Sequence, residues 1–411
     1  MSAETSKPTQ AKPIAAVPGW VETGLTALKL GLASFGGPAA HIGYFREEYV
    51  RRKQWLDEAA FADLNAMCQF LPGPASSQLG MAIAMRRAGI PGAIAAWAGF
   101  TLPSALLMTA FAYGYHALDA SASGILHGLK LAAVAVVAHA VWSMGRTLTP
   151  DLMRIGMALI TAVSVLLFPG IAGQLVPLAA CGAAGWIFMR KRMPSAPTAE
   201  GTHAPTGLSR RFAWGCLILF ALLLVLFPWL ARETGSAFAR IADIGYRAGA
   251  LVFGGGHVVL PMLEQESVRS GLLGEEQFMA GYGAAQAVPG PLFTFSAYIG
   301  AASSNGWDGV LRAAAMLVSI FLPSFLLVAG AMPFWERLRA NVSARAALAG
   351  VNASVVGLLL AALYDPVWKT AVYDPADAAV CAAAFAALLF RKIPPLWIAA
   401  ACAAAGWLTH G

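Results

Sequence analysis

The stretch Gln69-Phe70-Leu71-Pro72-Gly73-Pro74 returns 217 residues later as Gln286-Ala287-Val288-Pro289-Gly290-Pro291. Proline removes a backbone donor and clashes with the preceding helical turn, and glycine adds backbone freedom, so no continuous helix can pass through Pro-Gly-Pro. Both copies lie in largely apolar surroundings. The sequence therefore predicts two broken or re-entrant helical hairpins, over residues 59–85 and 276–302.

The chain around these breaks has the composition of a membrane protein. Of its 411 residues 58% are hydrophobic and 12% are charged, whereas soluble domains carry about a quarter charged residues. Apolar runs close to the roughly 20 residues needed to cross a bilayer recur, at 125–145, 153–168, 171–189, 212–230 and 344–363. The runs lack the alternation of barrel strands, so we expect an all-α polytopic protein embedded in a lipid bilayer.

The repeat extends well beyond Pro-Gly-Pro. Phe35-Gly36-Gly37-Pro38 returns as Phe253-Gly254-Gly255-Gly256, and Leu102-Pro103-Ser104 returns as Leu322-Pro323-Ser324. The sequence therefore predicts two homologous helical bundles, joined by a Pro/Thr/Gly-rich linker whose flanking basic residues place it in the cytoplasm. The predicted organisation is a polar N-terminal segment 1–19, a first transmembrane repeat 20–189, a cytoplasmic linker 190–211 and a second transmembrane repeat 212–411.

Loop charge indicates how the halves are oriented. Arg46, Arg51, Arg52 and Lys53 follow the first glycine motif, whereas four glutamates and one arginine follow the second. This difference favours opposite orientations, the inverted-repeat plan of many secondary transporters. Counting apolar segments instead gives an even number of crossings and parallel halves. Because 20–35 and 59–71 are too short or too polar for certain spans, we favour inversion.

Helices that restart after Pro74 and Pro291 would direct free N–H groups and positive dipole ends at an anion. Other donors or acceptors lie close by: Gln69, Ser76, Ser77 and Gln78 in the first half, and Gln286, Thr294 and Ser296 in the second. The alternative is that these groups only cap and pack helices. We expect the two interrupted loops to form a substrate site.

Each half also carries one cation six residues before its Phe-Gly-Gly motif, Lys29 and Arg247. A charge in a spanning segment is expensive and usually faces a cavity or a partner, so two equivalent cations suit a doubly charged anion. The alternative is that they snorkel or pair with Glu22 and Asp243. The motif glycines Gly36, Gly37, Gly254 and Gly255 either line the same site or let helices pack closely.

Further charged residues suggest a gate or proton coupling. Arg86 and Arg87 could gate an anion at the cytoplasmic side or simply anchor the topology. His41 and His257 lie just beyond the glycine motifs and titrate near neutrality. Glu48 and Glu266, which are 218 residues apart, are equivalent candidates.

Other functional classes lack their signatures. The net charge of +7 comes from short basic clusters between apolar segments, which favours membrane anchors over nucleic-acid binding. The five cysteines are isolated in apolar stretches and are expected to be core residues rather than metal ligands. No nucleotide-binding loop, nucleophile elbow or metal motif occurs in the sequence, so we expect a secondary transporter without a cofactor rather than an enzyme.

These motifs together resemble the chromate ion transporter (CHR) family. The resemblance rests on Phe35-Gly36-Gly37-Pro38, Gln69-x-x-Pro72-Gly73-Pro74, Arg86-Arg87-x-Gly89 and their echoes Phe253-Gly254-Gly255-Gly256-His257 and Pro289-Gly290-Pro291. The layout is similar to long-chain members, in which a fused duplication gives halves of opposite topology.

The resemblance implies export of chromate across the bacterial inner membrane, driven by a proton or electrical gradient and conferring chromate resistance. Because chromate and sulfate are both tetrahedral dianions, uptake or exchange of sulfate or another oxyanion is the alternative. An integral-membrane enzyme or assembly subunit is a remote third. The sequence leaves open whether two copies associate as a homodimer.

Overall fold

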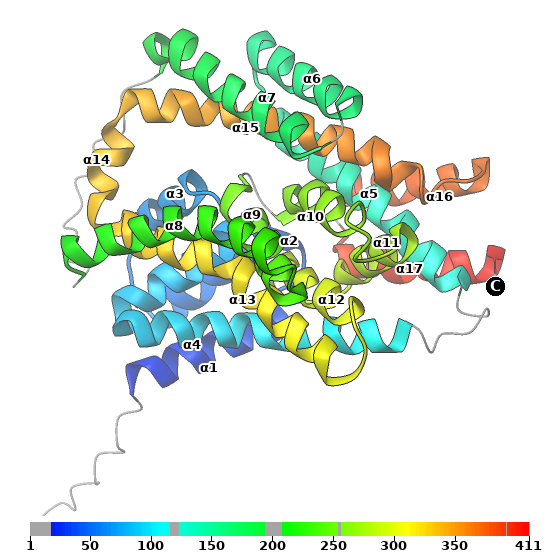
Figure 1. Ribbon diagram of the computed structural model, residues 1–411, viewed down its shortest axis with the longest axis horizontal. Helices are drawn as coiled ribbons and strands as arrows, with labels where there is room; N and C mark the ends of the chain where they lie inside the picture. The colour runs from blue at the N-terminus through cyan, green and yellow to red at the C-terminus, as the bar shows by residue number, and fades with distance from the viewer. Residues whose placement is uncertain are drawn as a thin grey trace, which may run out of the picture.

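The computed structural model describes residues 18–115, 123–168, 170–193, 208–253, 256–391 and 393–410. Every regular element in these ranges is a helix, which confirms the all-α prediction (Figure 1). The first half contains α1 (Gly19–Ala33), α2 (Gly37–Phe45) with its continuation η1 (Arg46–Arg52), α3 (Glu58–Phe70), α4 (Ala75–Tyr115), α5 (Ser123–Leu148), α6 (Leu152–Leu167) and α7 (Ile171–Ala184) with η3 (Gly185–Met189) and η4 (Arg190–Arg192).

The second half is preceded by an additional helix, α8 (Arg210–Thr234), for which the described first half has no counterpart. It continues with α9 (Ala237–Leu251), η5 (Gly256–Val258), α10 (Val259–Ser267), α11 (Glu275–Ala285), η6 (Leu292–Thr294), α12 (Phe295–Ala302), α13 (Gly306–Ala331), η7 (Met332–Phe334), α14 (Trp335–Ala340), α15 (Val342–Ala362), η8 (Leu363–Trp368), α16 (Pro375–Ala386), η9 (Ala387–Arg391) and α17 (Pro395–His410).

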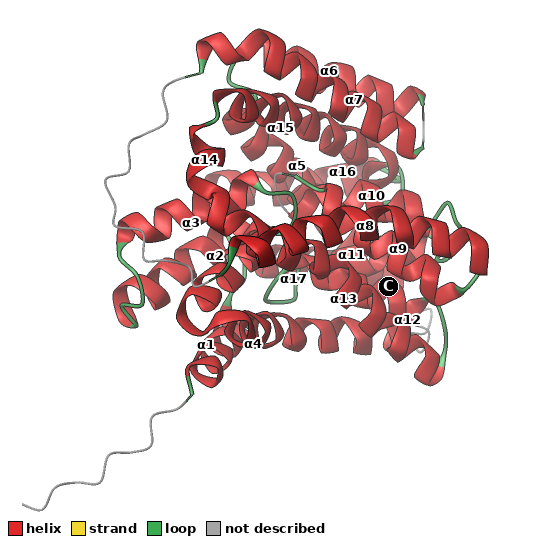
Figure 2. Cartoon of the chain, turned by 60° about the vertical axis from the view of Figure 1, so that its left-hand side comes forward, coloured by secondary structure: helices red, strands yellow, loops and turns green. Residues whose placement is uncertain are grey.

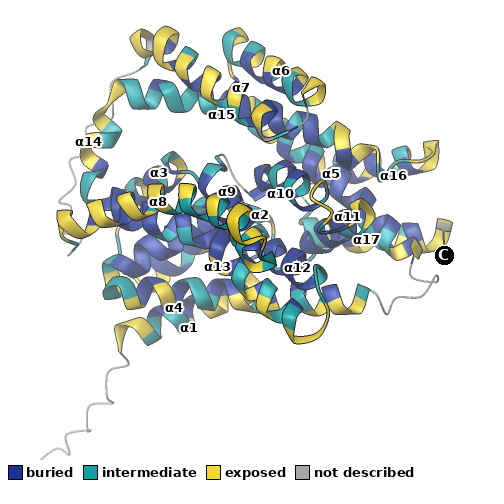
Figure 3. Ribbon diagram, in the orientation of Figure 1, coloured by how far each residue is buried: buried dark blue, intermediate teal, exposed yellow. Residues whose placement is uncertain are grey.

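Several helices have the length and surface expected in lipid. Six helices of the described chain are long and apolar enough to cross a membrane. On α8 the exposed residues include Trp214, Ile218, Leu222, Val225 and Trp229, and Figure 3 shows exposed residues along α6 and α8. Large apolar side chains that the fold leaves uncovered indicate contact with hydrocarbon, so this is a multi-pass membrane protein.

The helices break where the two Pro-Gly-Pro motifs predict. The first break lies between α3, which ends at Phe70, and α4, which begins at Ala75. The second lies between α11, which ends at Ala285, and α12, which begins at Phe295. A further break inside α4, at Ala88–Gly89, separates a short first part (75–87) from a long second part (90–115). The predicted interruption of both hairpins is confirmed.

Ion pairs show how the short first helices fold back. Lys53 at the end of η1 lies 3.2 Å from Glu22 at the start of α1. Arg87, at the end of the first part of α4, lies 3.2 Å from the same Glu22 carboxylate. The chain from residue 19 to residue 87 therefore makes two hairpins, α1–α2 and α3 with the start of α4, that return to one end of the molecule. The short segments that left the crossing count ambiguous are arms of these hairpins.

The two halves exchange one long helix each, α5 and α15. α5 packs against α16 and α17 of the second half, whereas α15 packs against α6 and α7 of the first. We call α5–α7 with α15–α17 the outer body and α1–α4 with α8–α13 the core body; α14 connects the two. Figures 1 and 2 show α6, α7 and α15 stacked beyond the core body. Neither half buries its apolar faces alone, so the halves fold as one unit.

Candidate anion site

Each Pro-Gly-Pro loop forms a backbone hydrogen bond with the other half of the chain, and the two bonds are equivalent. The N–H of Gly73 donates to the carbonyl of Val252 at 2.6 Å, and the N–H of Gly290 donates to the carbonyl of Ser34 at 2.8 Å. Val252 and Ser34 are the residues immediately before the two Phe-Gly-Gly motifs. Each Pro-Gly-Pro loop is therefore hydrogen-bonded to the residue that precedes the Phe-Gly-Gly motif of the other half.

Glycine is required in both loops because the backbone there is left-handed. Gly73 has φ +120° and Gly290 has φ +88°. A side chain would also collide, at Gly73 with the hydroxyl of Ser324 and at Gly290 with that of Ser104. The Ser104 hydroxyl donates to the carbonyl of Pro289. Sequence reasoning recorded Ser104 and Ser324 as repeated residues but missed them as neighbours of the loops.

Several buried polar atoms around the loops have no hydrogen-bond partner in the described structure. They are Ser34 Oγ, Ser77 Oγ, Gln78 Oε1, Thr101 Oγ1, Ser296 Oγ and Ser324 Oγ. The other predicted donors are engaged: Ser76 Oγ lies 3.2 Å from His41 Nδ1, and Thr294 donates to the carbonyl of Pro291 at 2.8 Å. Since buried polar groups are normally paired, this cluster can bind a polar guest.

The two predicted cations are not unpaired charges. Lys29 lies 2.8 Å from Glu48. Arg247 donates to both oxygens of Asp243, at 2.6 and 2.7 Å, and to both oxygens of Glu266, at 2.9 and 3.0 Å. Because the carboxylates neutralise these cations, we assign them the task of joining α1 to η1 and α9 to α10. The alternative pairing was correct for Asp243 and wrong for Glu22, which Lys53 and Arg87 occupy.

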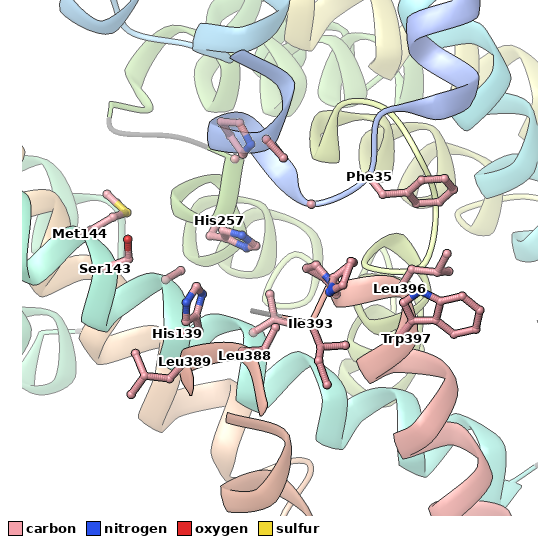
Figure 4. Close-up of a pocket in the computed structure, with 18 of the residues that line it drawn as sticks. Phe35, His139, Ser143, Met144, His257, Leu388, Leu389, Ile393, Leu396 and Trp397 are labelled. Carbon is pink, nitrogen blue, oxygen red and sulfur yellow. The ribbon is translucent and has the colours of Figure 1, made fainter. Parts of the chain in front are cut away.

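A cavity of about 690 Å³ lies where the first glycine motif faces the outer body. Phe35, Gly36 and Pro38 line one wall, and helix α5 together with the α16–α17 connection lines the other. His139 of α5 lies near His257 of η5 in this cavity (Figure 4). His257 Nδ1 is 2.9 Å from the hydroxyl of Tyr282. His139 has no repeat partner and no motif, so sequence reasoning missed it.

The remaining predicted residues are divided between this region and the surface. Gly37 starts α2 at φ +75°, whereas Gly254 and Gly255 lie outside the described residues. Gln286 is only 9% exposed, but Gln69 is exposed. Arg87 is held by Glu22 and Trp55, as a surface anchor would be, and Arg86 precedes it at the helix end.

The described residues hold no group of three His, Cys, Asp or Glu side chains that could ligate a metal ion. All five cysteines are buried and unbridged, as predicted. The groups at the loops that can still donate are buried hydroxyls, which suit an oxyanion.

The chromate transporter family model matches residues 21–186 and 239–407. The chain belongs to the chromate transporter family. The two matched segments are the two halves, and the interval between them contains the linker and α8. This chromate transporter family member is 29% identical over 93% of its length to a chromate transport protein of Pseudomonas aeruginosa, covering 90% of that protein.

Two other relatives have comparable coverage. A chromate transport protein of Cupriavidus metallidurans is 25% identical over 93% of this chain and 91% of its own length. A probable chromate transport protein of Synechococcus elongatus is 25% identical over 82% of this chain and 81% of its own length. No solved structure matches the chain.

Proposed function

We propose that this transporter is a secondary carrier that exports chromate from the bacterial cytoplasm across the inner membrane and thereby confers chromate resistance. The observation that carries the proposal is the pair of interrupted loops, surrounded by buried hydroxyls without partners. A tetrahedral dianion presents four acceptor oxygens, which match the buried hydroxyl donors that both halves contribute around the loops. Discontinuous helices from two repeats form transport sites of this kind in other carriers.

Opposite orientation of the halves is part of the proposal. Residues 19–87 begin and end on the same side of the membrane. The second part of α4 crosses the membrane and α5 crosses back, and α6 and α7 form a pair that also begins and ends on that side. Helix α8 then crosses once. The second half then starts on the opposite side. Basic residues support this placement, because Arg51, Arg52, Arg87, Arg190 and Arg210 all lie at ends assigned to the cytoplasm.

The test is chromate transport by the purified chain in proteoliposomes. Radiolabelled chromate should move against its concentration gradient when a membrane potential or pH gradient is imposed, and it should stop when the gradient is collapsed. Sulfate measured in parallel, in both directions, separates chromate export from general oxyanion uptake. A well-folded chain that moves neither anion under any gradient contradicts the proposal.

A further inference from the structure

A cleft of about 640 Å³ separates α3 of the core body from α15 of the outer body. Its polar lining comprises Asp63, Gln69, Arg339, Arg345 and Asn352. We propose that this cleft is the cytoplasmic entrance of the transport pathway, where Arg339 and Arg345 bind a tetrahedral oxyanion before it reaches the Pro-Gly-Pro loop. This entry site rests on the proposed function and adds a binding step to it.

The charges of the cleft favour an anion. Asp63 accepts from Arg339 at 2.8 Å and from the indole N–H of Trp335 at 2.9 Å. Arg345, in the first turn of α15, brings a second guanidinium to the same cleft, so its lining carries two positive charges and one negative. Guanidinium groups bind oxyanions with two parallel hydrogen bonds and are weakly hydrated.

The cleft leads toward the interrupted loop. Gln69 and Phe70, the last residues of α3, both line it, and Gly73 follows three residues later. The amide of Gln69 is exposed there, whereas its repeat counterpart Gln286 is buried. An anion held by the arginines would therefore meet Gln69 next on its way to the loop.

The equivalent contact in the other half is closed. There α11 packs directly on α5, so closely that a Cβ added at Gly283 would lie 2.5 Å from the carbonyl oxygen of Leu129. Lys130 Nζ lies 3.8 Å from Glu276 across this contact. Ala66 and Leu348, the counterparts of Gly283 and Leu129, both line the open cleft. Equivalent helices are thus in contact on one side and apart on the other, as one state of an alternating-access carrier requires.

The open cleft lies on the side assigned to the cytoplasm. Arg337 and Arg339 lie in α14, and Arg345 lies in the first turn of α15. Met193, which follows the basic η4, lines the same cleft. Basic residues gather in cytoplasmic connections. An exporter whose exit is closed would receive its anion through this opening.

The first test uses the full chain in proteoliposomes with radiolabelled chromate. The Arg345→Gln variant should raise the half-saturating chromate concentration about tenfold, equivalent to about 1.4 kcal/mol, with a smaller change in maximal rate. The half-saturating concentration of Arg345→Lys should lie between those of the wild type and Arg345→Gln, because lysine keeps the charge but loses the paired hydrogen bonds. The matched control Arg51→Gln removes a cation whose side chain is 62% exposed and lies outside the cleft, and it should stay within about twofold of wild type.

A second measurement does not depend on transport. In the purified chain the Asn352→Cys variant should react with a charged thiol reagent in the cleft, whereas Ala133→Cys, at the equivalent position of α5, should be protected because Ala133 is fully buried; the buried native cysteines give a low background. Equal reactivity at the two positions, or an unchanged half-saturating concentration in a folded and active Arg345→Gln protein, overturns the entrance while leaving the proposed function intact. A wild-type chain that moves no chromate overturns both.

Discussion

The two halves repeat one helical plan yet differ at one contact, where α11 meets α5 and α3 stands apart from α15. The sequences partly explain the difference. At the closed contact Gly283 has no side chain, which lets the backbones of α11 and α5 approach closely. Lys130 also lies near Glu276 there, whereas the equivalent positions at the open cleft are Ala349 and Ala59. Two equivalent helix contacts of a duplicated chain can therefore differ in how tightly they pack.

The cation pairs provide the largest expected contrast between the halves. Arg247 is 19% exposed and holds two carboxylates, whereas Lys29 is 57% exposed and holds one. Arg247→Gln leaves Asp243 and Glu266 without a counter-charge, so it should destabilise the fold by about 3–5 kcal/mol. Lys29→Gln should cost at most about 1 kcal/mol. Apparent melting temperatures of the purified variants measure the difference, and equal losses would show that the pairs are equivalent.

The loop glycines should show the next largest effect. Gly290→Ala places a side chain at φ +88° against Ser104, so we expect a loss of about 2 kcal/mol or more and a large drop in chromate transport. Gly215→Ala is the control, because Gly215 lies in α8 with nothing near a Cβ, and it should be neutral or slightly stabilising. Gly73→Ala should match Gly290→Ala if the two loops are equivalent.

Bulk at the gate contact separates the open side from the closed side. Gly283→Leu would overpack α11 against α5 and should destabilise this state by about 1–3 kcal/mol. The matching variant Ala66→Leu places the larger side chain in the open cleft, so its melting temperature should stay within about 1 °C of the wild type. The same side chain should slow chromate transport, because it would prevent the cleft from closing. A transport-competent Ala66→Leu protein would argue that the cleft does not close.

The smallest expected effect is a pH dependence confined to the second half. Burial raises the pKa of Glu264, in α10 outside the candidate spanning helices, from 4.5 to about 7. The folded protein holds this proton more tightly than the unfolded chain, so its ionisation removes stability as pH rises from about 4.5 to about 7. Glu264→Gln should raise the melting temperature by about 2 °C at pH 8 and leave it unchanged at pH 4.

The matched control for this pH effect is Arg46→Gln. Arg46 is the repeat counterpart of Glu264 and is exposed beside Glu58. It should show no comparable difference between pH 4 and pH 8. A rise at pH 8 in both variants would trace the effect to overall charge rather than to the buried carboxyl.

Sequence reasoning located the two interrupted loops but not the partners of the two cations. Gly73 and Gly290, with the hydroxyls that follow them, were predicted because proline and glycine act on the local backbone. Lys29 and Arg247 were read as charges facing the anion, yet their partners Glu48 and Glu266 lie 19 residues along the chain. Pairings at such a separation depend on how a hairpin closes, which hydropathy does not encode.

The sequence by itself determined that this protein is helical, embedded in lipid, duplicated and interrupted twice, because apolar length, proline and glycine exert their effects over a few residues. Only the tertiary structure decided that α5 and α15 are exchanged between the halves, that each Pro-Gly-Pro loop is hydrogen-bonded to the other half, and that α11 contacts α5 while a cleft separates α3 from α15. These features depend on which apolar faces meet. In helices that are hydrophobic nearly all round, no sequence period marks the face that packs against protein.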